Sequence, residues 1–415
     1  MIVRNRYVAA ALVVALIAAA FLSGYGYAQR GQAAGSARAE GFRLLEELAD
    51  RVNDSFINKN VDERKLFLGA AKGMLESLGD PYTRFMEPRA FEEFRQDARG
   101  FFFGVGIFID IKDGHLIVVQ PIKGTPAARA RLRAGDRIVK IDGVSTEGMA
   151  IQEAVVRIRG PRGTTVKLSI RRGSRDFEAP IIRDRIEIMA GEGPDSLDEA
   201  SRTALRAAAI GYVKLITFNE TTARAFDRLF DDARRTGAKA LILDLRSNGG
   251  GLLDVSLEVA NRFVPAGQAL VHTVDRNGRR TTERATAGPK ITMPVVVLTN
   301  EYTASASEIV SGALEDDGVA TLVGVKTFGK GVIQTIMDLP MNSGAAITTA
   351  KYLTPKGRDI HGRGLTPRVR VGETEDALRE RLHGKTDAEV DQALDRMHAD
   401  QLRKAIEILK QKMRR

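Results

Sequence analysis

The sequence predicts an α/β protein in which a helical N-terminal segment and a small β-rich domain precede the main core, and a charged helical tail follows it. Three observations support this organisation. Apolar residues recur at helical spacing over residues 40–100. They alternate with a period of two over much of residues 101–172. After a polar connection over residues 187–207, short apolar runs typical of buried strands alternate with helical stretches from residue 210 onward, which favours an α/β layer.

The composition excludes several classes of protein. The chain has 415 residues, of which 43% are hydrophobic, so it can form two or three domains with a large core. It has no cysteine, which excludes a thiol nucleophile, a disulfide framework and a Cys-ligated metal. The 63 basic and 53 acidic residues leave a net charge of +10, but the excess is scattered and aromatic residues are few. We therefore expect no nucleic-acid partner.

The N-terminus predicts export from the cytoplasm. Arg4 and Arg6 precede an apolar run over residues 7–22, and small residues follow as far as Ala28. This order is typical of a secretory signal. Counted through Tyr27, the run is also just long enough to span a membrane with the arginines inside. Residues 1–28 are thus predicted to be a signal peptide or a membrane anchor. We expect a periplasmic or extracytoplasmic protein, secreted or anchored to the inner membrane, with membrane association through residues 7–27.

The segment before the β-rich domain is predicted to be helical. Residues 29–39 form a Gly/Ala/Arg linker, and residues 40–100 contain helices with apolar faces. Pro81, in the sequence Gly79-Asp-Pro81, ends the second helix because proline cannot continue it. Two interpretations of this apolar helical pair stay open: it is an element for dimerisation or docking, or it simply covers one end of the main body.

Residues 101–186 carry several spaced motifs. They are Phe103-Gly-Val-Gly-Ile107, Pro126-Ala-x-x-Ala130-x-Leu132, Gly135-Asp-x-Ile138, Ile141-Asp-Gly143 and Arg159-Gly160 with Gly163-Thr164. Together they resemble a PDZ domain. Such domains bind a peptide as an added strand at a sheet edge, and loop glycines let backbone amides approach its terminal carboxylate. The resemblance implies that Phe103, Gly104, Val105, Gly106 and Ile107 bind peptide. The alternative is a β-domain that serves only as a spacer.

One serine of the main core is placed for nucleophilic chemistry. Ser305 lies between an apolar run at residues 295–298, predicted to be a buried strand, and helical spacing over residues 309–314. The first-turn amides and the dipole of that helix favour negative charge, which an acyl-transfer oxyanion would supply. The alternative is a helix cap, because Ser305-Ala-Ser-Glu308 also fits the capping-box pattern. Thr303 and Ser307 are further hydroxyls in the same stretch.

A nucleophilic serine needs a base. Lys330, between Gly329 and Gly331, is the best candidate, because a lysine in a water-poor site loses its proton more easily. The alternative for this residue is an ordinary surface lysine on a glycine-rich turn. There is no H-E-x-x-H motif, so a zinc protease is not expected. The chain has five histidines, His115, His272, His361, His383 and His398. The sequence does not exclude two of them, His272 and His361, as alternative bases.

Four motifs follow one another in the core. They are Asp244-Leu-Arg-x-Asn248-x-Gly250-Gly251, Thr303-Ala-Ser-Ala-Ser-Glu308, Thr327-Phe-Gly-Lys-Gly331 with Gln334, and Leu365-Thr-Pro367. With the inserted PDZ-like domain, they resemble the C-terminal processing, or tail-specific, serine protease family. The resemblance implies a ClpP/crotonase-like protease core over residues 187–371. It also implies that Ser305 is the nucleophile, Lys330 the general base and Gln334 the residue that positions the lysine, with an oxyanion hole at Gly251 (or Gly250) and Ala306.

Three features of these motifs require separate comment. On a straight strand, Lys330 and Gln334 would lie about 13 Å apart at Cα, so their meeting requires a bent backbone. Asp316 falls where the family can have an acidic residue, but on a continuous helix it would lie about 16 Å from Ser305, so we interpret it as structural. We have no account of Lys326, which stands where the family usually has an acidic residue.

The sequence therefore predicts a serine endopeptidase of the cell envelope that binds C-terminal tails through its PDZ domain and cleaves them by a Ser305–Lys330 acyl-enzyme mechanism. No metal, nucleotide or organic cofactor is expected. The expected partners are proteins or peptides with exposed C-terminal tails, an adaptor protein, and further copies of the chain in a homo-oligomer. Residues 372–415 form the charged helical tail, which packs on the core or on another subunit. The alternative is a non-catalytic PDZ scaffold or chaperone that retains the protease fold, or a chaperone-like PDZ protein with a histidine base.

Overall fold

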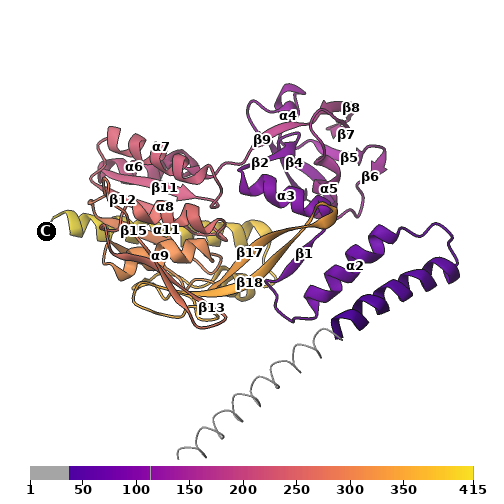
Figure 1. The fold of residues 1–415 in the computed structure, drawn as a ribbon. Helices are drawn as coiled ribbons and strands as arrows, with labels where there is room; N and C mark the ends of the chain where they lie inside the picture. The colour runs from indigo at the N-terminus through magenta and orange to yellow at the C-terminus, as the bar shows by residue number, and fades with distance from the viewer. Residues whose placement is uncertain (1–36, 113, 415) are drawn as a thin grey trace, which may run out of the picture. The chain divides into compact units, whose positions relative to one another are not determined.

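The computed structural model describes residues 37–112 and 114–414. The chain divides into two compact units, Met1–Glu87 and Pro88–Arg415 (Figure 1). The predicted signal peptide or anchor, residues 1–28, lies outside the described residues, as does most of the predicted linker. Within the described part of the chain, no helix is long and apolar enough to cross a membrane.

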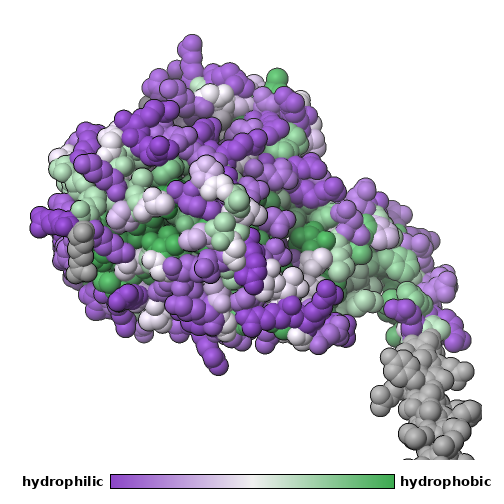
Figure 2. All heavy atoms as spheres, turned by 60° about the vertical axis from the view of Figure 1, so that its left-hand side comes forward, coloured by the Kyte–Doolittle hydropathy of each residue, from purple (hydrophilic) through white to green (hydrophobic). Residues whose placement is uncertain are grey.

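The first unit is a pair of helices followed by a short strand. Residues 37–55 are helical, α2 spans Glu63–Glu76, and β1 spans Arg84–Met86. Asp62 caps α2, because its carboxylate accepts the backbone N–H of Lys65 at 3.2 Å. Hydrophobic side chains of this unit lie on its surface (Figure 2); they include Phe42, Leu44, Leu48, Met74 and Leu78. The helical pair thus carries an apolar face that the protein leaves exposed.

The β-rich domain is closed by the pairing of its first and last strands. Helix α3 (Pro88–Ala98) leads into β2 (Phe101–Gly104), which pairs antiparallel with β9 (Asp184–Glu187). Between them is a sheet in the order β3-β4-β5-β7-β8, with β6 beside β5. Its core includes Val118, Ile138 and Leu168. The elements are β3 (Ile107–Lys112), β4 (His115–Pro121), α4 (Pro126–Arg129), β5 (Arg137–Ile141), β6 (Val144–Ser145), α5 (Ile151–Ile158), β7 (Thr165–Arg172) and β8 (Arg175–Ile182).

The main core is built on a six-stranded sheet in the order β10-β11-β12-β15-β16-β19. All neighbouring pairs are parallel except β10 and β11. The central strands β12 and β15 are buried along their whole length, as expected for parallel strands covered on both faces. The strands are β10 (Gly191–Glu192), β11 (Ile210–Leu215), β12 (Ala240–Asp244), β15 (Val295–Thr299), β16 (Ala320–Gly324) and β19 (Val369–Arg370).

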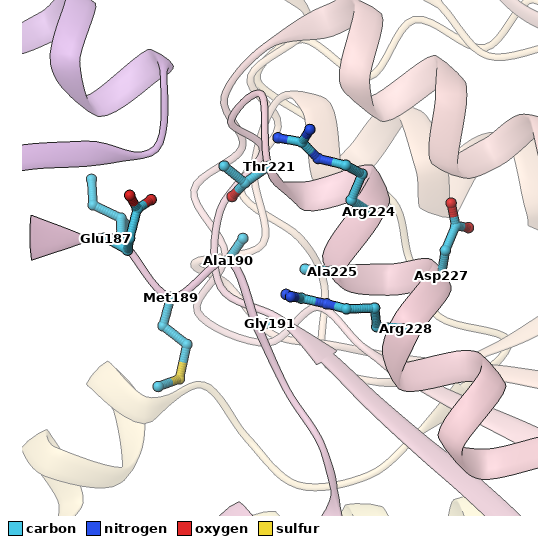
Figure 3. A pocket seen from close by; sticks show the side chains of 10 residues that line it. Glu187, Met189, Ala190, Gly191, Thr221, Arg224, Ala225, Asp227 and Arg228 are labelled. Carbon is cyan, nitrogen blue, oxygen red and sulfur yellow. The ribbon is translucent and has the colours of Figure 1, made fainter. Parts of the chain in front are cut away.

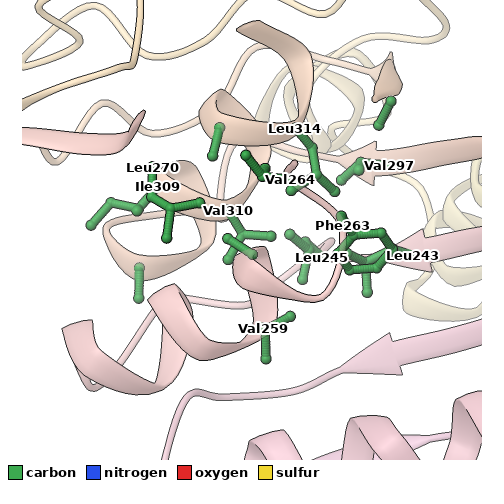
Figure 4. Packing of buried hydrophobic residues seen from close by; sticks show 14 of the residues in the cluster. Leu243, Leu245, Val259, Phe263, Val264, Leu270, Val297, Ile309, Val310 and Leu314 are labelled. Carbon is green, nitrogen blue, oxygen red and sulfur yellow. The ribbon is translucent and has the colours of Figure 1, made fainter. Parts of the chain in front are cut away.

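Helices cover both faces of this sheet. Helices α7 (Thr222–Arg235), α8 (Leu253–Asn261) and α9 (Ala306–Asp316) pack on one face. There Val259 and Val310 belong to the same apolar cluster as Leu243 and Val297 (Figure 4). Helices α6 (Glu199–Ala207) and α11 (Asp387–Met413) pack on the other face. Neighbouring residues of a strand therefore contribute to opposite layers, as the period of two requires.

Two predictions can be revised here. The stretch 187–207 was predicted to be only a polar connection, and this is wrong, because it contains β10, the 3-10 turn Pro194–Ser196 and helix α6. Asp198 caps α6, and Leu205 buries the helix against the sheet. The tail, predicted to pack on the core or on another subunit, packs on the core through Leu402, Ile406 and Leu409 of α11. Helix α10 (Glu375–Arg381) in turn packs against α11.

A second, antiparallel sheet joins the layer beside α9. Strand β18 (Ser343–Leu353) pairs with β13 (Ala269–Asp275) on one side and with β17 (Val332–Leu339) on the other, and β14 (Arg280–Arg284) pairs with β13. A short 3-10 turn, Pro340–Asn342, joins β17 to β18. The pairing of β17 with β18 shifts register between Ile333 and Gln334. Tyr352 of β18 is buried in the apolar cluster that includes α9, so this sheet is fixed to the start of that helix.

Candidate active site

Ser305 occupies a sharp turn between strand β15 and helix α9. Its backbone angles, φ 55° and ψ −116°, lie outside the usual regions for a residue with a side chain. Such strain persists only where neighbours hold the backbone. The Ser305 carbonyl accepts the Tyr352 hydroxyl at 3.0 Å and the backbone N–H groups of Glu308 and Ile309 at 2.8 and 3.0 Å. A strained turn between a strand and a helix is a known way to present a nucleophile.

The buried carboxylate of Glu308 joins the turns that carry Ser305 and Lys330. Its Oε2 accepts the backbone N–H groups of Ser305 and of Lys330, each at 2.9 Å. Its Oε1 accepts the Gly329 N–H at 2.8 Å and the Thr327 hydroxyl at 2.5 Å. The backbones of the predicted nucleophile and base therefore meet at a single oxygen atom, although the residues are 25 positions apart in the sequence.

Glu308 also accounts for the capping pattern. Burial raises the pKa of its carboxyl, while the hydroxyl of Thr327 and the three backbone N–H groups act in the opposite direction. A buried carboxylate with all these donors is well satisfied, and the first turn of α9 adds a favourable dipole. Glu308 does bond the N–H of the N-cap residue, as a capping box requires. Capping and nucleophile placement, which the sequence presented as alternatives, are therefore compatible.

Lys330 lies on a turn that packs closely against a second loop. It is half-buried, between Gly329, with φ 91°, and Gly331. A Cβ atom on Gly329 would lie 2.7 Å from the backbone nitrogen of Gly364, and one on Gly331 would lie 2.7 Å from that of His361. The flanking glycines are needed for this close approach. The turn is a constrained element and not an exposed glycine-rich loop.

Gln334 lies on β17, at the register shift that follows Ile333. A register shift of this kind is a point at which a strand can bend. The Gln334 Nε2 donates to the Thr348 hydroxyl of β18 at 3.3 Å.

The glycine loop after β12 lies directly against the nucleophile. Gly250 and Gly251 have φ values of 100° and 143°, which favour glycine. A Cβ atom on Gly250 would lie 2.9 Å from both the Ser305 Cβ and the Ala306 nitrogen. The Gly250 N–H donates to the Asn248 side chain at 2.9 Å, within its own loop. The remaining candidates for an oxyanion hole are therefore the N–H groups of Gly251 and Ala306.

Asn248 and Tyr352 are residues of the site whose roles the sequence analysis did not foresee. The Asn248 carbonyl accepts the Ala304 N–H at 3.1 Å and the Ser307 hydroxyl at 2.9 Å. Ser307 thus links α9 to the glycine loop. Burial and the charge of Glu308 raise the pKa of Tyr352, so its hydroxyl remains a donor to Ser305. Asn248 is part of the motif that begins at Asp244, so the sequence drew attention to its position. No sequence pattern indicated Tyr352.

Three other candidate side chains are engaged in contacts away from Ser305. The Thr303 hydroxyl donates to the Leu245 carbonyl at 2.8 Å. Both ring nitrogens of His272 are engaged, with Thr282 at 2.7 Å and with the Pro355 carbonyl at 2.9 Å. Asp316 accepts the Lys356 N–H at 2.9 Å and pairs with Arg358 at 2.5 Å, as expected for a structural residue. Within residues 37–112 and 114–414, no group of three or more histidine, aspartate and glutamate residues is arranged to bind a metal.

The β-rich domain has a narrow groove where a peptide was predicted to bind. The groove has a volume of about 90 Å³ and lies between the loop before β3 and helix α5. Its lining includes four of the five predicted residues, Gly104, Val105, Gly106 and Ile107. Phe102 lines the groove in place of Phe103, whose ring instead packs against Phe101 with 5.4 Å between ring centroids.

A larger hollow of about 740 Å³ lies away from the candidate catalytic groups. It is bordered by residues 187–191, from the end of β9 to the start of β10, and by one side of α7, including Arg224 and Arg228 (Figure 3). Neither Ser305 nor Lys330 lines it.

Comparisons with known proteins agree with the motifs. The chain matches the sequence models of peptidase family S41 over residues 209–371, a PDZ domain over residues 117–172 and the activating protease CtpB N-terminal domain over residues 23–90. It is 36% identical over 342 residues to the carboxy-terminal processing protease CtpA of Bacillus subtilis, covering 82% of this chain and 71% of that protein.

Two further similarities extend over most of the chain. It is 35% identical over 352 residues to the carboxyl-terminal-processing protease of Picosynechococcus sp., covering 84% of this chain and 83% of that protein. It is also similar to the solved structure of a photosystem II D1 C-terminal processing protease, with 32% identity, a TM-score of 0.47 and coverage of 79% of this chain and 92% of that one.

Proposed function

Because the chain belongs to peptidase family S41, the carboxyl-terminal processing proteases, we propose that it is a serine endopeptidase with a Ser305–Lys330 dyad that cleaves protein substrates near their C-terminal tails. One observation carries the proposal. The Glu308 carboxylate binds the backbone N–H groups of both dyad residues. Ser305 at the same time lies against the glycine loop that offers oxyanion donors.

The proposed reaction begins with Lys330 in its neutral form. Its Nζ takes the proton from the Ser305 hydroxyl as the oxygen attacks the scissile carbonyl carbon. The oxyanion that forms accepts hydrogen bonds from the N–H groups of Gly251 and Ala306. The tetrahedral intermediate then breaks the C–N bond, and the amine leaves with the proton held by Lys330. Water attacks the acyl-enzyme with Lys330 again acting as base, and the serine is released.

Gln334 is proposed to restrict the position of the lysine from β17. It lies at the register shift of this strand, and its amide is held by the Thr348 hydroxyl. A residue on a rigid, paired strand can limit the positions of a flexible lysine side chain, which is what a general base requires.

The PDZ domain is proposed to receive the substrate tail. The groove beside Gly104 and Gly106 is narrow and apolar, and Val155 and Ile158 of α5 form its other side. It suits an extended peptide with an apolar end, bound as an added strand. The export signal predicted over residues 1–28 supports a location in the cell envelope. The exposed apolar face of the first unit supports association with a second copy of the chain.

A peptide-cleavage assay tests the dyad. Ser305→Ala and Lys330→Ala, made separately, should each abolish cleavage of a tail peptide with an apolar C-terminus. Lys326→Ala is the matched control, because Lys326 is an exposed lysine just before the same turn. Full activity in either dyad variant would refute the mechanism. A wild-type protein that binds the peptide but cleaves nothing would favour the scaffold alternative, and loss of activity only in His272→Ala or His361→Ala would favour a histidine base.

A further inference from the structure

The C-terminal helices contact both loops that carry the candidate catalytic groups. We name residues 246–251 the oxyanion loop and residues 300–305 the nucleophile loop. Helices α10 and α11 lie beyond residue 371, where the match to the peptidase family ends. Helix α11 packs on the face of the sheet opposite α9, and α10 packs against α11. Nevertheless, their polar side chains reach the loops at the end of the central strands.

The first link joins α11 to the start of the oxyanion loop. Arg246 Nη1 donates to the Gln401 Oε1 at 3.0 Å and to the His398 carbonyl at 3.1 Å. The other side of the guanidinium binds Asp244, with distances of 2.5 to 3.1 Å. Gln401 is fully buried, and its Nε2 donates to the Val371 carbonyl at 3.2 Å. Both ends of the Gln401 amide are used, so its orientation toward Arg246 is fixed.

The second link joins α10 to both loops through Asn300. The Asn300 Nδ2 donates to the Glu375 Oε1 at 2.9 Å and to the Ser247 hydroxyl at 3.1 Å. The Asn300 Oδ1 accepts the Ser247 N–H at 2.8 Å. Ser247 has a positive φ of 59°, which is uncommon for a residue with a side chain and therefore depends on such support. His398 of α11 reaches the same Glu375 oxygen at 3.2 Å.

These links continue to the groups that would react. Two residues beyond Arg246, the Asn248 carbonyl receives the Ala304 N–H and the Ser307 hydroxyl on either side of Ser305. The Asn248 side chain receives the Gly250 N–H. A shift of Arg246 or Ser247 is therefore transmitted to the Gly250 backbone and to the turn at Ser305. A misplacement of about 1 Å in such groups can reduce a rate by about 100-fold.

We propose that Gln401 and Glu375 are positioning residues, through which the C-terminal helices hold the oxyanion and nucleophile loops in their reactive geometry. The inference rests on the proposed protease function. Apolar contacts of Leu402, Ile406 and Leu409 attach α11 to the sheet, so the helix does not need Gln401 in order to stay docked. Gln401 therefore acts on the oxyanion loop, through Arg246, and not on the docking of the helix.

The test uses the full chain with substitutions that remove or retain each acceptor. Gln401→Ala and Glu375→Ala should each lower kcat on the order of 10-fold to 100-fold, with KM nearly unchanged. Glu375→Gln keeps an oxygen for Asn300 and should recover most of the loss. Gln401→Glu keeps an acceptor for Arg246 and should be more active than Gln401→Ala. Gln411→Ala is the matched control on the exposed side of α11 and should behave as wild type.

Hydrogen exchange provides a readout that does not depend on activity. Gln401→Ala and Glu375→Ala should increase amide exchange in residues 246–251 and 300–305, with strand β12 unchanged. A wild-type protein that cleaves nothing would refute the proposed function, whereas exchange would still test the positioning role. Unchanged loop exchange in both alanine variants would overturn the inference. The inference would also be overturned if the loss of kcat were fully explained by the fraction of protein that is unfolded and Glu375→Gln gave no rescue.

Discussion

Adding a single methyl group at Gly250 should separate the oxyanion loop's role in catalysis from its role in the fold. The Cβ of Gly250→Ala would lie 2.9 Å from the Ser305 Cβ, 2.9 Å from the Ala306 nitrogen and 2.8 Å from the Ala304 carbonyl oxygen. All three neighbours belong to the constrained turn between β15 and α9, so none is the flexible end of a side chain. Relief of the contacts requires the loop and the nucleophile turn to move apart.

The size of the effect can be worked out from this geometry. Ordinary contacts of a Cβ atom begin at about 3.5 Å, so the two segments must separate by roughly half an ångström or more. The φ of 100° adds strain for alanine of about 1–3 kcal/mol. Loss of one oxyanion donor typically lowers kcat by about 100-fold to 1000-fold. We therefore expect kcat to fall by about that factor, while binding of the tail to the PDZ groove is retained.

Gly249→Ala is the matched control. It lies in the same loop, has no positive φ, and an added Cβ atom there would meet nothing within 4 Å. Steady-state cleavage of a tail peptide gives kcat and KM for both variants, and thermal unfolding reports their stability. Near-wild-type kcat in Gly250→Ala would refute the proposed placement of the oxyanion hole. An equal loss in both variants would show that the loop responds to any substitution.

Three further outcomes follow from the described contacts. Glu308→Gln should cost about 2–6 kcal/mol and most of the activity, because its amide group would face two buried donors, whereas Glu315→Gln on the same helix should be nearly neutral in a cleavage assay. Gly106→Ala should weaken tail binding in a fluorescence titration, since its Cβ would lie 2.5 Å from Thr125, while Gly143→Ala meets no such neighbour. Burial raises the pKa of Asp244, but the charge of Arg246 and the hydrogen bonds from Arg246 and Tyr212 together outweigh burial and hold that pKa below its usual value. The resulting stability is present above the unfolded pKa of about 3.9 and is lost as pH falls through the lower folded pKa. Asp244→Asn should therefore lower the free energy of unfolding at neutral pH by about 3–5 kcal/mol and flatten its decrease in acid, as measured by denaturant titration.

Local patterns in the sequence were sufficient to locate the nucleophile turn. Residues 295–298 form a buried strand and residues 306–316 a helix, because an apolar run and a period of 3.6 carry that information directly. The residue types alone also favoured Lys330 as the base, and the resemblance supplied the assignments of Gln334 and the oxyanion hole. The small helix α6 was missed because its buried face contains few large apolar residues besides Leu205.

Long-range polar contacts could not be predicted in the same way. The pattern Ser305 to Glu308 indicated a local cap, but three of the four bonds to Glu308 come from residues 19 to 22 positions away. The bond between Arg246 and Gln401 spans 155 positions. Helical spacing predicted that α11 exists, yet it carries no information about which buried polar group faces which loop. Such pairs are set by how the layers pack, and only the folded chain brings them together.

The location of the candidate site follows from the parallel strands of the core. Asp244 pairs with Leu298, and Leu298 pairs with Val323, so β12, β15 and β16 end at the same level. Their following loops carry the glycines, the serine and the lysine, in the order of the strands. Sites in open α/β sheets form at this edge because the loops of neighbouring strands meet there. Loops alone are not rigid, and here each neighbouring pair is joined by a buried polar group. Asn300 joins the loop after β12 to the loop after β15. Glu308 joins the loop after β15 to the loop after β16. Because each link is a buried hydrogen bond that water cannot replace, it holds two of the candidate catalytic loops at a fixed separation.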